Sequence, residues 1–240
     1  MLIHSQIVEF KGEGTSTYGY LAHPKGEGIF PGVVVLQEWW GIDTHIQQVT
    51  EHLAQEGFAA LAPDLYRGQV ATTIEVARHL SQQLDQEQVL QELQQAMRYL
   101  EHSPLVQSEK VGGLGFGMGG HLATLLASTG ITLGALVILY GDHDNPANIT
   151  PETSIHDTNA PFLGIYGGQD ETRPQEYINE LKEKLTSMGT QHQIIIYPHA
   201  SRSFLNPDRD TYRAEDANDA WQHTVSWLRQ HLINTQPPQP

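Results

Sequence analysis

The residues best suited to chemistry lie in a glycine-rich stretch in the middle of the chain, Gly115-Phe116-Gly117-Met118-Gly119. This stretch has the form of a nucleophile elbow, a strand–turn–helix in which Gly-x-Ser-x-Gly, or a version with cysteine, holds a reactive side chain on a strained turn. The central position is Gly117, which has no side chain and enters such a turn without the strain that other residues carry. The sequence therefore predicts an elbow without its nucleophile.

Two other interpretations of this stretch are a generic glycine-rich turn and a dinucleotide-binding loop. A dinucleotide-binding loop follows the first strand of its fold and precedes an acidic residue roughly 20 positions later. The stretch lies in mid-chain instead, so we disfavour that interpretation and expect no cofactor.

Further polar residues follow apolar stretches that read as buried strands. Ligands of open α/β sheets sit beyond the carboxyl ends of the parallel strands, so these residues are expected to share one rim with Gly117. Carboxylate and imidazole groups also make a hard metal site an alternative, although their spacing matches no metal motif and aspartates commonly shape turns. The candidates are Glu38, Asp142, His143, Asp144, Asp170 and two residues of the loop after Tyr197, His199 and Arg202.

The elements that position these residues alternate between strands and helices, which predicts an α/β fold with a mostly parallel sheet and helices on both faces. An antiparallel edge hairpin, 7–10 and 18–22 around a turn at 12–14, opens the chain. Later strands are expected at 33–36, 58–61, 111–116, 133–140, 162–166 and 193–197. Helices are expected at 43–56, 73–101 (one long or two shorter), 118–126, 174–188 and 212–233.

Composition limits the classes of partner. The chain has 240 residues with a formal net charge of -15, which is a poor match to nucleic acid or an anionic membrane. It contains no cysteine, which excludes disulfides and a thiol nucleophile. No signal peptide or membrane span is evident, so we expect a cytoplasmic protein with one domain over 1–234 and a disordered tail at 235–240.

Several motifs in order resemble one family, the dienelactone hydrolases of the α/β-hydrolase superfamily. The similarity covers most of the chain and is specific in its order and spacing rather than in any single motif. It implies an α/β-hydrolase fold and a small ester, lactone or carboxylate as ligand. The motifs are Gln37-Glu38-Trp39-Trp40-Gly41, Pro63-Asp64-Leu65-Tyr66, the elbow at 115–120, Tyr166-Gly167-Gly168-Gln169-Asp170 and Tyr197-Pro198-His199-Ala200.

The resemblance carries the family's functional positions onto this chain residue by residue. The nucleophile falls on Gly117 and the histidine on Arg202, whereas the acid, Asp170, and the glutamate of the early strand, Glu38, match the family. Glycine has no side chain and arginine stays protonated, so this pair cannot perform the family's acyl transfer.

The resemblance further implies that the backbone amides of Trp39 and Met118 form an oxyanion hole, which could still bind a carbonyl or carboxylate. An arginine in this loop needs a carboxylate partner, so we expect Asp170 and Arg202 to form a partly buried ion pair. Alternatively, Arg202 binds an anionic ligand.

The two replacements predict a family member that is inactive by the family's mechanism and retains a ligand-binding pocket. The alternative is an active ester or lactone hydrolase in which Glu38 or His199 activates water. A metal-assisted hydrolase built on Asp142, His143 and Asp144 is a third hypothesis. We expect a monomer or a small homo-oligomer.

Overall fold

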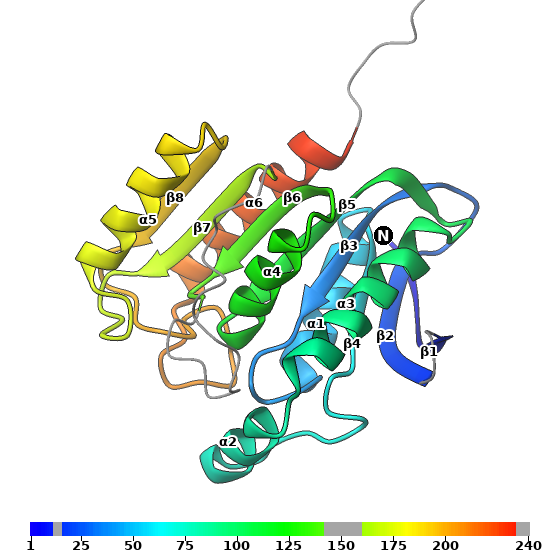
Figure 1. Cartoon of the computed structure of the whole chain (residues 1–240), viewed down its shortest axis with the longest axis horizontal. Helices are drawn as coiled ribbons and strands as arrows, with labels where there is room; N and C mark the ends of the chain where they lie inside the picture. The colour runs from blue at the N-terminus through cyan, green and yellow to red at the C-terminus, as the bar shows by residue number, and fades with distance from the viewer. Residues whose placement is uncertain (12–15, 142–159, 234–240) are drawn as a thin grey trace, which may run out of the picture.

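The computed structural model describes residues 1–11, 16–141 and 160–233, which form one eight-stranded sheet with helices on both faces (Figure 1). The strand order is β1-β2-β4-β3-β5-β6-β7-β8. β2 pairs antiparallel with both β1 and β4, and the remaining neighbours pair in parallel. The predicted α/β fold with a mostly parallel sheet is confirmed.

The elements follow the predicted order. The strands are β1 (Ile3–Lys11), β2 (Ser16–Pro24), β3 (Phe30–Leu36), β4 (Ala59–Pro63), β5 (Val106–Phe116), β6 (Leu133–Leu139), β7 (Phe162–Gly167) and β8 (His192–Tyr197). The helices are α1 (Thr44–Gln55), α2 (Ile74–Gln82), α3 (Gln86–Glu101), α4 (Met118–Ser128), α5 (Gln175–Ser187) and α6 (Ala214–Leu232).

Two apolar layers cover the sheet. α2, α3, α4 and α5 pack on one face and α1 and α6 on the other, as the front and back of Figure 1 show. Successive residues of β3 alternate between the layers: Val34 and Leu36 face the first, Val33 and Val35 the second. Burial on both faces explains why this strand is a continuous apolar run rather than an alternating one.

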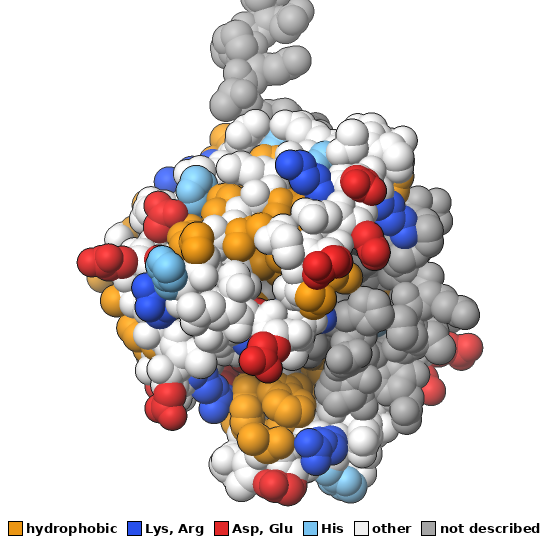
Figure 2. All heavy atoms as spheres, turned by 90° about the vertical axis from the view of Figure 1, so that its left-hand side faces the viewer, with side chains coloured by type: hydrophobic (Ala, Val, Ile, Leu, Met, Phe, Trp, Pro, Cys, Tyr) orange, Lys and Arg blue, Asp and Glu red, His pale blue; other side chains and the backbone are white. Residues whose placement is uncertain are grey.

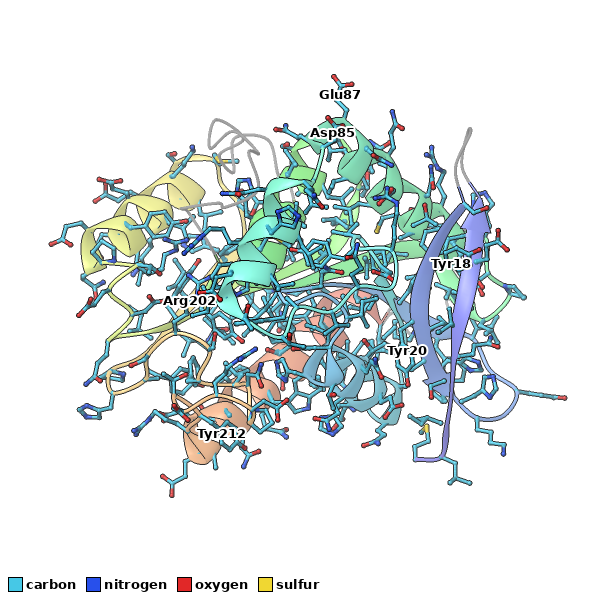
Figure 3. The ribbon with its side chains drawn as sticks, turned by 90° about the horizontal axis from the view of Figure 1, so that it is seen from below. Tyr18, Tyr20, Asp85, Glu87, Arg202 and Tyr212 are labelled. Carbon is cyan, nitrogen blue, oxygen red and sulfur yellow. The ribbon has the colours of Figure 1, made fainter. Side chains whose placement is uncertain are left out.

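The antiparallel edge is the predicted hairpin, with Ile3 to Lys11 in register with Pro24 to Ser16. Its expected turn at 12–14 lies outside the described residues. In Figure 3, Tyr18 and Tyr20 of β2 lie at the side of the molecule away from Arg202, which is on the loop between β8 and α6. The hairpin therefore closes the sheet far from the candidate site.

Side-chain caps determine where helices α1 and α3 begin. The Asp43 carboxylate accepts a hydrogen bond from the amide of Ile46 at 3.0 Å, which fixes the start of α1 as predicted. The segment 73–101 forms two helices, because Asp85 caps α3 by accepting from the Gln88 amide at 2.9 Å. This decides between the one-helix and two-helix alternatives.

Most predicted helix boundaries differ from the observed ones by a residue or two, and the starts of α5 and α6 are examples. Pro174 is the residue before α5 and has an extended ψ of 156°, instead of lying inside the first turn. α6 begins at Ala214 rather than at 212, because Arg213 still has an extended backbone. Both differences fall at helix ends, where the local conformation is least determined by periodicity.

The surface mixes charges and apolar groups. Figure 2 shows acidic and basic side chains interspersed on the face it presents, with hydrophobic side chains gathered at the level where α2 lies in Figure 1. Ile74 and Val76 of α2 are exposed at 51% and 40%. Among the described helices, none is long and apolar enough to cross a membrane.

Candidate functional site

The elbow is formed by the end of β5, Gly117 and the start of α4. Gly117 has φ 52° and ψ −115°, in the left-handed half of the map that other residues enter only with strain. Its amide donates to the carbonyl of Leu139 at 3.0 Å, which ties the turn to β6. A Cβ atom at Gly119 would collide with the backbone of Leu36, so close packing of α4 against β3 requires glycine there.

Glu38 lies directly beside the elbow. It follows the end of β3, is 4% exposed, and its Oε1 would lie 3.5 Å from a Cβ atom at position 117. Burial raises the pKa of this carboxyl to about 7, although the positive charge of Arg202 acts in the opposite direction. At neutral pH the group therefore titrates, as a general base must.

Arg202 occupies the other side of the turn. Its Nη2 would lie 3.1 Å from a Cβ atom at position 117, and its Nη1 donates to the hydroxyl of Thr172 at 3.2 Å. The side chain is partly buried on the loop after β8. A guanidinium group thus lies where the side chain of an elbow nucleophile would project.

Asp170 is buried at 5% exposure after β7, but it makes no ion pair with Arg202. Its Oδ1 accepts from the amide of Thr172 at 3.0 Å and from the Thr172 hydroxyl at 2.6 Å, while its Oδ2 has no hydrogen-bond partner among the described residues. The predicted direct pair is wrong, because a local turn two residues long captures Asp170. The Thr172 hydroxyl instead links the two groups in a chain from Arg202 to Asp170.

The two candidate oxyanion residues, Trp39 and Met118, directly follow Glu38 and Gly117 in the sequence. Met118 is buried and is the first residue of α4, so its amide is one of those without an acceptor in its own helix. Trp39 is next to Glu38 and packs edge-on against Trp40, with ring centroids 5.5 Å apart. That these two amides bind a ligand stays a prediction.

His199, the other candidate base, is exposed on the loop after β8. No described contact joins its side chain to Glu38 or Gly117. The metal candidates Asp142, His143 and Asp144 lie outside the described residues. Within the described ranges, no group of three or more His, Asp or Glu side chains is arranged to hold a metal ion.

Sequence reasoning missed three residues that shape the site. Thr172 mediates the contact between Arg202 and Asp170, and its place two residues after an aspartate was the available signal. Tyr140 directly follows β6, has φ 42°, is fully buried, and has a raised pKa because of burial and the neighbouring charge of Glu38. Arg209 stacks over Trp40 at 3.9 Å from the ring centroid, and no sequence pattern identified it.

A fourth residue that sequence reasoning missed, Arg173, connects the turn that contains Asp170 to the end of β6. It is 3% exposed, donates through Nε to the carbonyl of Gly141, and lies 5.0 Å from the ring centroid of Tyr177.

Comparison with known proteins identifies this arrangement. Residues 17–232 match the sequence profile of the dienelactone hydrolase family. The chain belongs to the dienelactone hydrolase family. A Synechocystis protein named "Putative carboxymethylenebutenolidase" is 32% identical over 242 residues, covering 96% of this chain and 98% of that protein.

Solved structures of dienelactone hydrolases share the fold. A Klebsiella pneumoniae structure described as a "Putative Dienelactone Hydrolase" has a TM-score of 0.86 at 29% identity, covering 96% of this chain and 100% of the other. The dienelactone hydrolase from Anabaena variabilis has a TM-score of 0.69 at 25% identity, covering 96% and 99%. The α/β-hydrolase fold and the resemblance from sequence are both confirmed.

Proposed function

We propose that this member of the dienelactone hydrolase family does not hydrolyse by the family's nucleophilic route, and that it binds a small carboxylate, ester or lactone at the elbow. The observation that carries the proposal is the position of Arg202, whose Nη2 lies 3.1 Å from where a side chain at Gly117 would begin. A guanidinium group cannot accept a proton from a nucleophile, and glycine has no side chain that could act as the nucleophile.

The same groups favour an anionic or strongly polarised oxygen in the ligand. The guanidinium of Arg202 is a fixed cation with planar donors, which suits a carboxylate. The N-terminus of α4 begins at Met118 and contributes unpaired amides and the positive end of the helix dipole. A ligand oxygen near Gly117 would meet both.

Glu38 supports a second candidate, an ester or lactone hydrolase in which this carboxylate activates water. A pKa of about 7 makes Glu38 half ionised at neutral pH, which is the condition for an effective general base. Arg202 beside it would stabilise the negative charge that develops on the substrate oxygen.

Catalysis separates the two candidates. We expect the chain to hydrolyse p-nitrophenyl acetate and dihydrocoumarin no faster than buffer does, and the double variant Gly117→Cys with Arg202→His to gain measurable turnover. The single variants are the matched controls and are expected to stay near background. Turnover by the unaltered chain that rises with pH through about 7 and disappears in Glu38→Gln would instead establish the second candidate.

Binding tests the ligand site directly. We expect benzoate, a small carboxylate, to bind saturably in calorimetric titrations, and Arg202→Gln to weaken binding roughly tenfold to a hundredfold, the range of one charge-assisted hydrogen bond of about 1.5–3 kcal/mol. Arg98→Gln, on the exposed side of α3, is the control for loss of one positive charge. Equal benzoate affinity in the Arg202 and Arg98 variants would contradict the proposed site.

Expectations on location and assembly stay predictions. A cytoplasmic location, a monomer or small homo-oligomer, and the lack of nucleic-acid or membrane partners depend on the charge and sequence pattern alone.

A further inference from the structure

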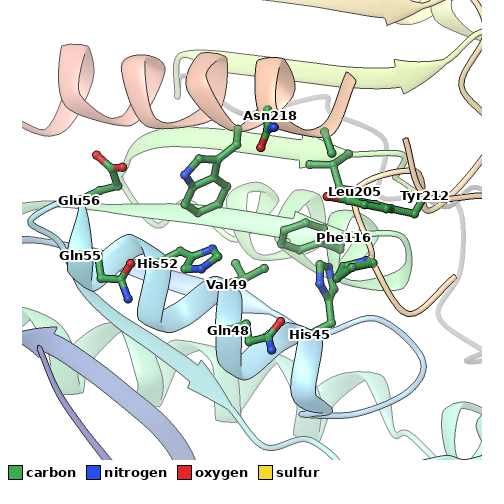
Figure 4. A pocket seen from close by; sticks show the side chains of 13 residues that line it. His45, Gln48, Val49, His52, Gln55, Glu56, Phe116, Leu205, Tyr212 and Asn218 are labelled. Atoms are coloured by element: carbon green, nitrogen blue, oxygen red, sulfur yellow. The ribbon is translucent and has the colours of Figure 1, made fainter. Parts of the chain in front are cut away.

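A second pocket, of about 330 Å³, opens between α1 and α6 (Figure 4). From α1 it is lined by residues of one helical face, including His45, Val49 and His52, and from α6 by Ala217 and Trp221. Its inner side is formed by Phe116, the last residue of β5. The pocket therefore lies on the α1 and α6 face of the sheet, whereas α4 leaves the elbow on the opposite face.

The loop between β8 and α6 forms part of the wall of this pocket. Leu205, Pro207 and Tyr212 of this loop line the pocket, and Arg202 of the same loop faces Gly117. Figure 4 shows Leu205 and Tyr212 beside Phe116, across from α1. The elbow and the pocket therefore share this loop and Phe116, which ends β5 directly before Gly117 and lines the pocket on the opposite face of the sheet.

Aromatic rings from α1, β5 and α6 form part of the lining. His45 meets Phe116 edge to face, with centroids 5.5 Å apart and planes at 80°, and His52 meets Trp221 in the same way at 6.0 Å. Rings fixed at these angles leave faces and edges for another ring to pack against. The volume exceeds the roughly 150 Å³ in which an apolar cavity of another protein holds benzene.

One polar group in the lining lacks a partner. His45 is 5% exposed, and its Nε2 is buried with no hydrogen-bond partner among the described residues. Burial lowers the pKa of His45 to about 4, so the ring is neutral at pH 7 and offers one donor and one acceptor. Buried polar atoms are usually satisfied. This nitrogen is closed off from the cavity, so a ligand group in the pocket would complete it once the His45 ring turns toward the ligand.

Charge in the lining selects against ions. None of the described residues that line the pocket is a lysine or arginine, and the acidic one, Glu56, is paired with Arg229 at 2.6 Å. The remaining polar lining residues are the amides Gln48, Gln55 and Asn218 and the Tyr212 hydroxyl. The two arginines near the lining are each matched by an acidic group, Arg229 by Glu56 and Arg209 by Asp208, which acts on His45 in the opposite sense. A carboxylate would therefore meet no excess of positive charge here, in contrast to the elbow.

We propose that the pocket between α1 and α6 is a second binding site, separate from the elbow, for a small uncharged aromatic molecule with one hydrogen-bonding group. The ring packs among Phe116, Trp221 and Val49. The polar group hydrogen-bonds with the imidazole of His45.

The test uses two probes with the same ring, benzyl alcohol and benzoate, titrated into the full chain and followed by NMR of the histidine and tryptophan rings. Benzyl alcohol is expected to produce saturable shifts of His45, His52 and Trp221. Benzoate is expected to leave these rings unshifted. Non-saturating shifts, or benzyl alcohol shifts only at Trp39 and Trp40, would overturn the proposal.

Variants locate the binding. Ala217→Leu fills the pocket from α6 and should weaken benzyl alcohol at least tenfold without changing benzoate affinity. Ala217 is buried, so Asn218→Trp, from the exposed rim, serves as a second variant should the first fail to fold. Unchanged benzyl alcohol affinity in either variant, provided that it folds, would overturn the proposed site. This conclusion would not depend on whether benzoate still binds at the elbow.

A third variant tests the polar contact. His45→Phe keeps an edge for Phe116 to pack against but removes both ring nitrogens. We expect it to weaken benzyl alcohol at least fivefold and to leave toluene unchanged. An equal loss for both probes would overturn the role of His45 as the hydrogen-bonding group.

Discussion

Glu38 shows how burial and a neighbouring charge, that of Arg202, together set the ionisation of a carboxyl group beside the elbow. Burial alone would keep the Glu38 carboxyl protonated above neutral pH, and the guanidinium beside it moves the pKa back to about 7. The Asp170 Oδ2, by contrast, is buried without a hydrogen-bond partner in the part of the chain that the structure describes, a cost of about 1–3 kcal/mol for such a group. The unmet acceptor lies in the residue that the family would use to orient its histidine.

The pKa of Glu38 predicts a specific dependence of stability on pH. Its folded value, about 7, is above its ordinary value of 4.5, so between these values the folded state holds a proton that the unfolded state has lost. The contribution of Glu38 to the unfolding free energy is therefore greatest below pH 4.5 and falls by about 3 kcal/mol as pH rises to 7. Chemical denaturation of the chain and of Glu38→Gln at several pH values would measure this as a difference between the curves.

His45 changes the pH dependence of stability in the opposite direction, so the effect of Glu38 has to be isolated by comparison with a variant. Its pKa is lowered from 6.5 to about 4, so its contribution is full above pH 6.5 and is lost as pH falls toward 4. Between pH 4.5 and 6.5 the two groups offset each other in the unaltered chain. Parallel curves for the chain and Glu38→Gln would show that the carboxyl is not held in a protonated form.

At the scale of elements, short capping contacts decide where the helices begin. Asp85 separates α2 from α3 and satisfies an amide that has no acceptor in its own helix. Glu87 lies in the same first turn, and Figure 3 shows both acidic side chains at the same outer edge of the molecule. Asp85 and Glu87 therefore carry the same charge, but only Asp85 caps the helix.

This pair makes a matched prediction. We expect Asp85→Ala to lower the unfolding free energy by about 1 kcal/mol through loss of the cap, and Glu87→Ala to lower it by about 0.3–0.5 kcal/mol through the helix dipole alone. Urea denaturation at low salt measures both. Equal losses would mean that the Asp85 hydrogen bond adds nothing beyond its charge.

The sequence predicts most of these elements but less of the site. Apolar runs such as Val33 to Leu36 determine the strands, and the glycines around Gly117 determine the elbow, because local geometry demands those residue types. The partner of Arg202 could not be predicted, since it depends on the competition between Thr172 and the guanidinium for Asp170. Such contacts depend on small differences in the distances between polar groups on segments that are far apart in the sequence.

At the scale of the whole molecule, both apolar layers depend on a single sheet. Residues of β3 contribute to both layers, so unfolding of this strand would disrupt both layers at once. Trp39 and Trp40 pack against the first layer, while Trp221 packs against the second and Trp227 belongs to it. The four tryptophans thus report on both faces.

We therefore expect both faces to unfold together. Guanidinium denaturation followed by fluorescence of Trp39→Phe/Trp40→Phe, of Trp221→Phe/Trp227→Phe, and by far-ultraviolet circular dichroism should give superimposable transitions for each variant. An earlier transition of the variant that retains Trp221 and Trp227 would show that α6 detaches before the sheet unfolds.

The loop between β8 and α6 has a consequence for protein engineering. Because Arg202 and the pocket wall of Leu205, Pro207 and Tyr212 are only a few residues apart, grafting a complete catalytic loop from an active relative would replace both at once. An engineer who wanted hydrolysis alone should exchange single residues at 117 and 202 and leave 204–212 as they are. A whole-loop exchange would confound any gain in turnover with a change in what the other face of the protein can hold.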